Sequence, residues 1–215
     1  MTGLSERLER CYSGAVYDVL RELGLHAQSL PATIRPLDPT RKLAGPAFTA
    51  SGHFEAGLDP HETLLAWTGL LSKAPAASVV VCQPNDSTLA HMGELSAETL
   101  RLRGVRGYVV DGGCRDADFL LDMGFPVFCR YLTPADIVGR WIVDALGEPI
   151  EIGGVTIRGG DYVLGDRDGV VVVPAELADE VVTRTEAIVQ TESALRRAIL
   201  GGMDPQEAYR QFGMF

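Results

Sequence analysis

Two short segments of the sequence carry side chains that could bind a metal ion and an anionic substrate. The first turn ends at His91–Ser96 and holds Glu94, and the second turn, Asp111–Asp116, holds Arg115 and Asp116. Each turn follows a continuous apolar segment of strand length and leads into a helical pattern. If the two strands are parallel neighbours, both turns lie at the carboxyl edge of the sheet, where open α/β sheets bind ligands. We therefore expect one crevice to contain these three charged side chains.

The types of these side chains favour metal-assisted chemistry on a carboxylate. The planar guanidinium of Arg115 matches the two oxygens of a carboxylate, and the free N–H groups at each helix start favour an anion. Asp116 and Glu94 are hard oxygen ligands, which suit Mg²⁺ or Mn²⁺ better than zinc. A simpler alternative stays open, in which Glu94 and Asp116 complement helix dipoles and Arg115 pairs with one of them.

Other titratable residues near these turns are weaker candidates. His91 adjoins the first turn and could act as a base, but a single histidine near a site is more often structural. His53 and His61 are less well placed. Cys114 could be a nucleophile, yet no histidine follows at a convincing position, so a small turn residue is the favoured interpretation.

The elements that must position the two turns alternate between strands and helices. This alternation predicts βαβ units and a partly parallel sheet. The predicted strands of this region are Ala44–Ala50, Ser78–Cys82, Gly107–Asp111 and Pro126–Cys129, and the predicted helices are Ser5–Leu23, His61–Lys73, Glu94–Arg103 and Arg115–Met123.

The pattern changes after Gly139. Glycine pairs separate short β segments, which predicts antiparallel hairpins or a small barrel-like layer. The predicted segments are Val155–Ile157, Tyr162–Leu164 and Val170–Val173. A long helix over Glu176–Leu200 follows, and Asp204 and Pro205 are typical of the N-cap and first turn of a last short helix.

Composition limits the possible classes of protein. The 215 residues carry a net charge of −10, which disfavours binding to nucleic acid phosphates. No apolar run is long enough to cross a membrane. The four cysteines do not form a CxxC pair, which favours reduced thiols. We expect one cytoplasmic domain over residues 1–215, with neither nucleic acid nor membrane as a partner.

Glu192 interrupts the apolar stripe of the long helix. At helical spacing it falls in the middle of five apolar residues, Leu177, Val181, Ile188, Leu195 and Ile199. A carboxylate there is costly unless it is paired or faces a wet interface. Two alternatives remain, an ion pair with Arg196 one turn later and a functional contact.

The two turns and several further segments resemble one family of enzymes. Gly93–Ser96 and Gly104–Asp116 place twenty residues between Glu94 and Arg115, and this spacing resembles the signature of 4-hydroxy-4-methyl-2-oxoglutarate/4-carboxy-4-hydroxy-2-oxoadipate aldolases, which group with the RraA-like proteins. Further matching segments are Val16–Leu20, Leu43–Ala47, Gly124–Phe128, Gly153–Val155, Gly160–Asp161 and Asp166–Pro174. The family pattern is not matched at Gly57–Glu62, where an Asp-Asn pair is expected, and at Cys114, where a small aliphatic residue is commoner.

The resemblance implies a fold, an assembly and a set of roles. It implies a swivelling β/β/α-type α/β fold with a partly parallel sheet and C-terminal helices, assembled as a homotrimer or hexamer with sites between subunits. Asp116 would ligate Mg²⁺ or Mn²⁺ directly, and Arg115 would contact the pyruvyl unit. Backbone N–H groups of Gly93, Glu94, Leu95 and Ser96 would hold the substrate carboxylate. Glu94 would reach the metal through water. The C-terminal helices, about 175–215, would pack on a neighbouring subunit, and Glu192 would in this way reach that subunit's metal, also through water.

The function expected from this resemblance is that of a metal-dependent lyase. It would stabilise the enolate of pyruvate, either in retro-aldol cleavage of a 4-hydroxy-2-oxo acid or in decarboxylation of oxaloacetate, with a small 2-oxo acid as its substrate. The alternative is a non-catalytic RraA-type regulator that binds a ribonuclease or another protein. Asp116 distinguishes the two, because the regulators resemble this chain in fold but look to lack that acid. A methyltransferase is disfavoured, since no glycine-rich turn follows the first strand.

Overall fold

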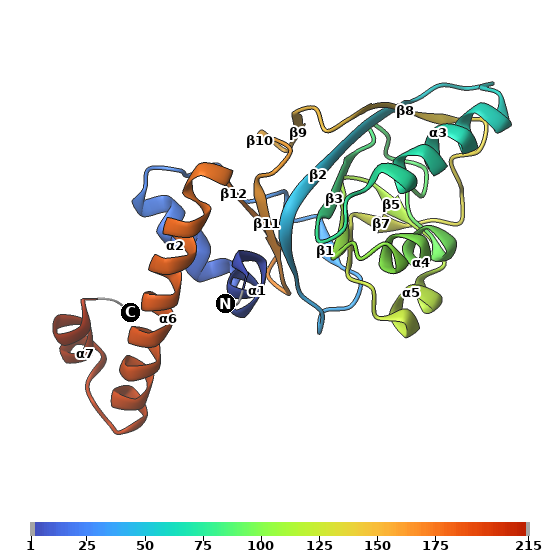
Figure 1. Cartoon of the computed structure of the whole chain (residues 1–215). Coiled ribbons are helices and arrows are strands. Elements are labelled where there is room, and N and C mark those ends of the chain that lie inside the picture. The colour runs from blue at the N-terminus through green and yellow to red at the C-terminus, as the bar shows by residue number, and fades with distance from the viewer. Residues whose placement is uncertain (1–2, 214–215) are drawn as a thin grey trace.

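The computed structural model describes residues 3–213, which form a mixed eight-stranded sheet flanked by helices (Figure 1). The strand order is β1-β6-β4-β3-β2-β11-β12, and β8 pairs with β2 outside this path. The strands of this sheet are β1 (Arg35–Pro36), β2 (Leu43–Phe54), β3 (Val79–Gln83), β4 (Gly107–Val110), β6 (Val127–Cys129), β8 (Trp141–Leu146), β11 (Tyr162–Gly165) and β12 (Val170–Val173). Two small sheets pair β5 (Gly113–Cys114) with β7 (Tyr131–Leu132), and β9 (Ile150–Ile152) with β10 (Val155–Ile157).

The parallel part of the sheet agrees with the pattern in the sequence. Strands β2, β3, β4 and β6 are parallel neighbours, and the continuous apolar segments of β3 and β4 are buried except at Gln83. Because these strands are covered on both faces, their side chains show no alternation. The hairpins expected after Gly139 are also confirmed, since β9 pairs with β10, and β11 with β12, in antiparallel register.

Strand β8 was not predicted. It pairs antiparallel with β2 across a register shift between Ser51 and Gly52, and its side chains are mostly half-buried. A strand of this kind carries neither a continuous apolar run nor a clean alternation, so its sequence lacks the usual signal.

Helices α3, α4 and α5 lie on one side of the sheet, and α1, α2 and α6 lie beyond β11 and β12 on the other (Figure 1). The helices are α1 (Leu4–Arg10), α2 (Ser13–Glu22), α3 (Pro60–Lys73), α4 (Glu94–Leu102), α5 (Ala117–Met123), α6 (Ala178–Leu200, preceded by a 3₁₀ turn at Ala175–Leu177) and α7 (Pro205–Phe212). Asp204 caps α7 by accepting bonds from the N–H groups of Gln206 and Glu207. The N-cap expected there is confirmed.

The single helix predicted over Ser5–Leu23 is wrong, because the chain forms two helices with a break at Cys11 and Tyr12. Both residues have extended backbone. The buried carboxylate of Asp166 accepts bonds of 2.7 Å from the N–H and the hydroxyl of Ser13. These long-range bonds satisfy donors at the start of α2 and replace continuation of the helix.

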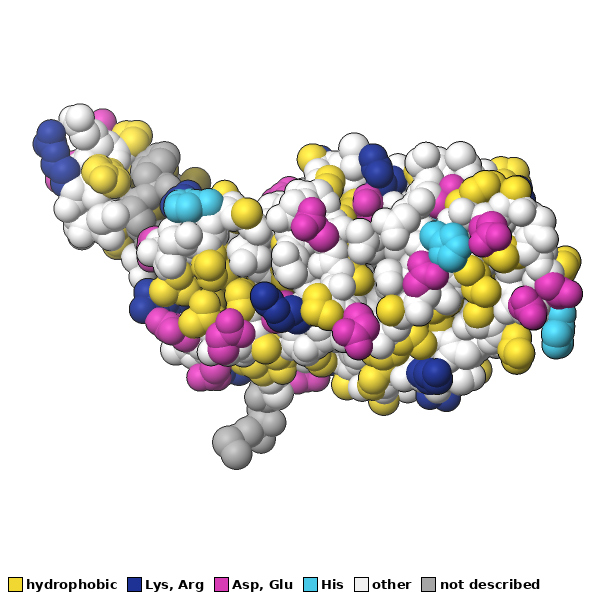
Figure 2. Space-filling model, turned by 90° about the horizontal axis from the view of Figure 1, so that it is seen from above, with side chains coloured by type: hydrophobic (Ala, Val, Ile, Leu, Met, Phe, Trp, Pro, Cys, Tyr) yellow, Lys and Arg dark blue, Asp and Glu magenta, His cyan; other side chains and the backbone are white. Residues whose placement is uncertain are grey.

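Helix α6 begins against the body of the molecule and then extends away from it (Figure 1). Its first half packs on α1 and α2 through the buried residues Val181, Val182 and Thr185. Acidic side chains are scattered over the face seen in Figure 2, and the basic side chains visible there lie apart from one another. Over residues 3–213, no helix is both long and apolar enough to cross a membrane.

Candidate functional site

The two turns identified in the sequence meet in one cavity at the carboxyl edge of the parallel strands. Strand β3 leads to α4, and its parallel neighbour β4 leads to α5. Glu94 and the adjoining residues Gly93, Leu95 and Ser96 line a cavity of about 450 Å³ together with Arg115 and Asp116. The structure therefore brings together all the expected site residues of this region.

Asp116 adopts an unusual backbone conformation that directs its carboxylate toward the first turn. Its φ angle of 57° lies in the left-handed region, which costs a non-glycine residue about 1 kcal/mol or more. Its side chain does not cap its own helix α5. Instead, Asp116 Oδ2 accepts a 3.1 Å bond from the N–H of Glu94. The carboxylate thus joins the start of α4 rather than simply complementing α5.

Gly93 is required by the close approach of the two turns. A Cβ at this position would lie 2.6 Å from Asp116 Oδ2, and 3.2 and 3.3 Å from Arg115 Cγ and Nε. The backbone of Gly93 is extended, with φ of −154°, so space and not backbone strain excludes a side chain. This contact explains a glycine immediately before Glu94.

Arg115 has a second acidic neighbour that the sequence did not reveal. Its Nε lies 3.5 Å from Asp116 Oδ2, and its Nη1 lies 3.3 Å from Asp136 Oδ2. Burial opposes ionisation of Asp136, but the hydrogen bonds from Arg140 and the Val138 N–H and the charge of Arg115 lower its pKa overall. Two carboxylates therefore orient the guanidinium. Asp136 lies twenty-one residues after Arg115 and no local pattern links them.

His91 lines the same cavity but is poorly suited to act as a base. Its side chain is fully buried, and neither ring nitrogen has a hydrogen-bond partner among the described residues. Burial lowers the pKa of His91 to about 4, although Asp86 Oδ2 lies 3.6 Å from its Nε2. The ring packs edge-on against Trp141, with a centroid separation of 5.0 Å. These contacts favour the structural interpretation, with a neutral imidazole next to an ionised aspartate.

Cys114 is a buried residue and not an exposed nucleophile. Its Sγ lies 3.4 Å from Cys129 Sγ. The contact with Cys129, together with burial, raises the pKa of the Cys114 thiol far above its usual value. A thiol held neutral in this way has little nucleophilic character.

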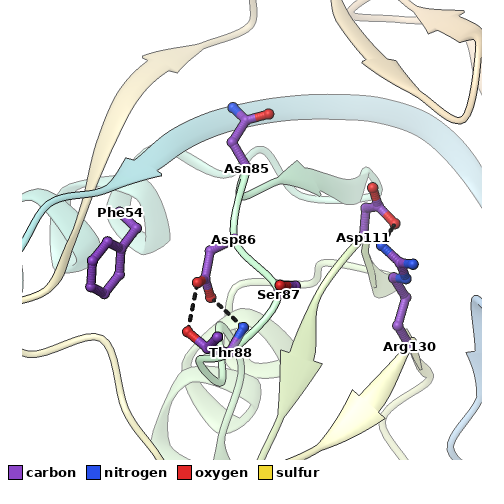
Figure 3. Close-up of a pocket in the computed structure, with 7 residues that line it drawn as sticks. All are labelled: Phe54, Asn85, Asp86, Ser87, Thr88, Asp111 and Arg130. Atoms are coloured by element: carbon purple, nitrogen blue, oxygen red, sulfur yellow. Dashed lines mark hydrogen bonds and ion pairs between the residues drawn. The ribbon is translucent and has the colours of Figure 1, made fainter.

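A second cavity, of about 440 Å³, lies at the same sheet edge (Figure 3). Its charged groups already have partners. Asp86 accepts bonds from the N–H groups of Thr88 and Leu89, and Asp111 faces Arg130 at 3.3 Å. No residue of the two predicted clusters, Gly93–Ser96 and Arg115–Asp116, lines it. The first cavity is therefore the better candidate site.

Glu192 lies apart from this cavity within its own chain. Its Oε2 contacts the hydroxyl of Tyr12, and burial together with this contact raises the pKa of Tyr12. The ion pair with Arg196 considered from the sequence is not formed. Helix α6 lies across the sheet from α4 and α5 (Figure 1), so any role of Glu192 at a metal would need another subunit.

Comparison with known proteins identifies the family. The model of the RraA-like family, which is described as aldolase/RraA, matches residues 13–172. The chain belongs to the RraA-like family. It is 32% identical to a Halalkalibacterium halodurans protein provisionally named 4-hydroxy-4-methyl-2-oxoglutarate aldolase, over 84% of this chain and 83% of that protein.

Other RraA-like relatives differ in length and in name. Protein DlpA of Legionella pneumophila is 30% identical over 99% of this chain, which spans only 34% of the length of DlpA. The crystal structure of Streptomyces coelicolor RraAS2, described as an unusual member of the RNase ES inhibitor RraA protein family, superposes with a TM-score of 0.81. That protein is 29% identical, and the match covers 90% of this chain and 96% of RraAS2. The expected RraA-like fold is thus confirmed.

The donors in this RraA-like cavity fit a hard divalent ion that retains water. Over residues 3–213, no three His, Cys, Asp or Glu side chains gather into a complete metal cage. Mg²⁺ is commonly held by one or two carboxylates, with water and substrate oxygens filling its other positions. The carboxylate of Asp116 has an adjacent space that exists because residue 93 has no side chain. Asp116 therefore fits Mg²⁺ or Mn²⁺ better than zinc, which favours nitrogen and sulfur ligands.

Proposed function

We propose that this RraA-like protein is a divalent-metal-dependent carbon–carbon lyase that forms the enolate of pyruvate. The observation that carries the proposal is the carboxylate of Asp116, held in a left-handed turn beside Arg115 and against the N–H of Glu94. Strain of this kind persists where surrounding contacts enforce it, and it is concentrated at functional sites. The names of the related aldolases support the same activity.

The cavity offers binding groups for a 2-oxo acid. Arg115 would donate two N–H groups to the substrate carboxylate, and the free N–H groups at the start of α4 would add further donors. Asp136 keeps the guanidinium in position. A Mg²⁺ or Mn²⁺ ion at Asp116 would act as a Lewis acid toward the keto oxygen.

The polarised keto group of the substrate could accept the electron pair of a broken bond in two different cleavage reactions. In retro-aldol cleavage, a base takes the proton of the 4-hydroxyl, the C3–C4 bond breaks, and its electron pair passes to C3. The C4 fragment leaves as a carbonyl compound, and protonation of C3 gives pyruvate. Oxaloacetate would instead lose CO₂ from C4 and needs no base. Glu94 lines the cavity, has no ion-pair partner among the described residues, and is our candidate to accept the proton through water.

We further propose that the site is completed by a second copy of the chain, in a homotrimer or hexamer. Glu192 is half-buried in the middle of an apolar stripe, and the helix that carries it extends from the body of the molecule (Figure 1). Packing of residues 175–215 on a neighbour would bring Glu192 toward the other chain's Asp116. Removing the segment after Ala175 should then abolish assembly and activity together. The four cysteines are free thiols, in keeping with the cytoplasmic location expected from the sequence.

Assay of the purified protein with oxaloacetate, in the presence of Mg²⁺ or Mn²⁺ and then of EDTA, tests the proposal. Asp116→Ala should abolish turnover in either metal. Asp118→Ala, in the first turn of the same helix, is the matched control, because each helix-start acid contributes only about 0.3–1 kcal/mol to stability. Full activity of Asp116→Ala in EDTA would refute the metal-dependent lyase. Inactivity of wild type toward all 2-oxo acids would instead favour a protein-binding regulator.

A further inference from the structure

Two buried cysteines lie side by side, and one of them immediately precedes Arg115 in the chain. Cys114 belongs to β5 and Cys129 ends β6, and their Sγ atoms are 3.4 Å apart. The sulfurs of a disulfide are about 2.05 Å apart, so an approach of about 1.4 Å would join this pair. Among residues 3–213, no such contact between sulfurs involves Cys11 or Cys82.

The two sulfurs differ in their access to solvent. Cys114 has no exposed surface, whereas Cys129 retains 6%. Arg130, the residue after Cys129, lines the second cavity (Figure 3). The contact with Cys114 lowers the pKa of the Cys129 thiol, although burial opposes this effect. Because the thiolate is the nucleophile of a cysteine, Cys129 is the sulfur with which a small oxidant would react first.

The position of Cys114 couples this pair to the candidate site. The N–H of the next residue, Arg115, donates a 2.9 Å bond to the carbonyl of Met92, and Asp116 follows in its left-handed conformation. Since protein interiors are close-packed, drawing the Cys114 sulfur toward its partner would also move this backbone. The conformation of Asp116 persists only while surrounding contacts enforce it. A disulfide would therefore displace Arg115 and Asp116.

We propose that Cys114 and Cys129 form a reversible disulfide on reaction with a peroxide, and that this disulfide inactivates the adjacent site. The sulfur of Cys129 attacks one oxygen of hydrogen peroxide, the O–O bond breaks, and the second oxygen leaves as water. Cys129 is then a sulfenic acid. The sulfur of Cys114 attacks the Cys129 sulfur, the S–O bond breaks, and the oxygen leaves as a second water with the proton of Cys114.

The balance of this step is simple. Two thiols are oxidised to one disulfide, and one hydrogen peroxide is reduced to two waters. A thiol reductant reverses the reaction by thiol–disulfide exchange. The loss of activity rests on the proposed lyase function, whereas formation of the disulfide does not.

Peptide mapping detects the disulfide directly. Cleavage at arginine places the two cysteines in separate tryptic peptides, Gly107–Arg115 and Asp116–Arg130. Reduced protein is treated with hydrogen peroxide, blocked with iodoacetamide and digested without reductant. We expect the two peptides to be joined, with a mass two hydrogen atoms below their sum, and dithiothreitol to separate them. Separate peptides, either alkylated or carrying added oxygen, would refute the disulfide.

Two measurements on the same samples test the effect on the site. Mn²⁺ binding, followed by electron paramagnetic resonance, should weaken at least about tenfold on oxidation. Turnover of oxaloacetate should fall about 10²-fold, because misplacement of a reacting group by about 1 Å can have that effect. Both should recover in dithiothreitol. Unchanged Mn²⁺ binding and turnover in the oxidised protein would refute the regulation. Reduced protein that binds Mn²⁺ without turnover would refute the lyase function, and Mn²⁺ binding would still decide whether oxidation alters the site.

Variants assign the effect to this pair. Cys129→Ala and Cys129→Ser should keep the turnover and Mn²⁺ binding of the reduced wild type and lose the response to peroxide; two substitutions are used because the residue is almost fully buried. Cys11→Ser is the matched control, since Cys11 Sγ donates to the carbonyl of Arg7 and a hydroxyl can do the same. It should respond as wild type does. A full response to peroxide in both Cys129 variants would place the oxidation elsewhere and overturn the inference.

Discussion

Replacing Gly93 by alanine provides a sharp test of the candidate site, because the change adds a single methyl group beside Asp116. That Cβ would lie 2.6 Å from Asp116 Oδ2, and ordinary contact begins at 3.4 Å, so the carboxylate must move by 3.4 − 2.6 = 0.8 Å. The nearby atoms of Arg115, at 3.2 and 3.3 Å, block part of the available space. Misplacement of a reacting group by about 1 Å can lower a rate about 10²-fold.

We therefore expect Gly93→Ala to lower kcat/KM about 10²-fold and to raise the metal concentration needed for half-maximal activity. The fold should survive, because φ of −154° suits alanine and the hydrogen bond at risk contributes about 1 kcal/mol. Its loss would lower Tm by about 2–4 °C in a chain of this size. Steady-state kinetics during metal titration, with thermal unfolding, measure these quantities.

Gly69→Ala on α3 is the matched control, because no atom lies within 4 Å of its added Cβ. It should stabilise α3 by up to about 1 kcal/mol and leave kcat/KM unchanged. The double variant Gly93→Ala/Asp116→Ala should be no slower than Asp116→Ala alone, since both changes act on one carboxylate. Wild-type kcat/KM and metal dependence in Gly93→Ala would refute the geometry proposed for Asp116.

Three further predictions follow from other contacts. Arg115→Lys should lower kcat/KM by about 10²-fold or more despite the retained charge, because lysine lacks the planar fork; near-normal kinetics would assign Arg115 a structural role. Glu192→Gln should lower turnover with assembly intact in sedimentation, whereas Tyr12→Phe, which removes the other partner of that contact, should alter stability alone; equal turnover in both variants would exclude a role for Glu192 at the metal. In the folded chain His91 stays neutral down to about pH 4, whereas in the unfolded chain it binds a proton below about pH 6.5. The free energy of unfolding should therefore decline by about 3 kcal/mol as the pH falls from above 6.5 toward 4. Denaturant unfolding of His91→Gln across this range should show a smaller decline, and an identical pH profile would contradict burial of a neutral imidazole.

Local patterns in the sequence determined the parallel core of the sheet and both site turns. Strands β3 and β4 are continuous apolar segments because they are buried on both faces. The spacing between Glu94 and Arg115 follows from this arrangement, since one helix and one strand separate two turns at the same sheet edge. The cap at Asp204 also depends only on adjacent residues. The resemblance to a family supplied the roles of these residues, which their types alone left open.

Contacts between distant segments decided the remaining features. The break between α1 and α2 depends on the bonds of Ser13 to Asp166, and the orientation of Arg115 depends on Asp136. Burial of His91 depends on Trp141 of the unpredicted strand β8. Each contact joins residues that no helical or strand period relates, because only folding brings them within reach. The sequence therefore determined which groups reach the sheet edge, and tertiary packing decided how they are held and paired.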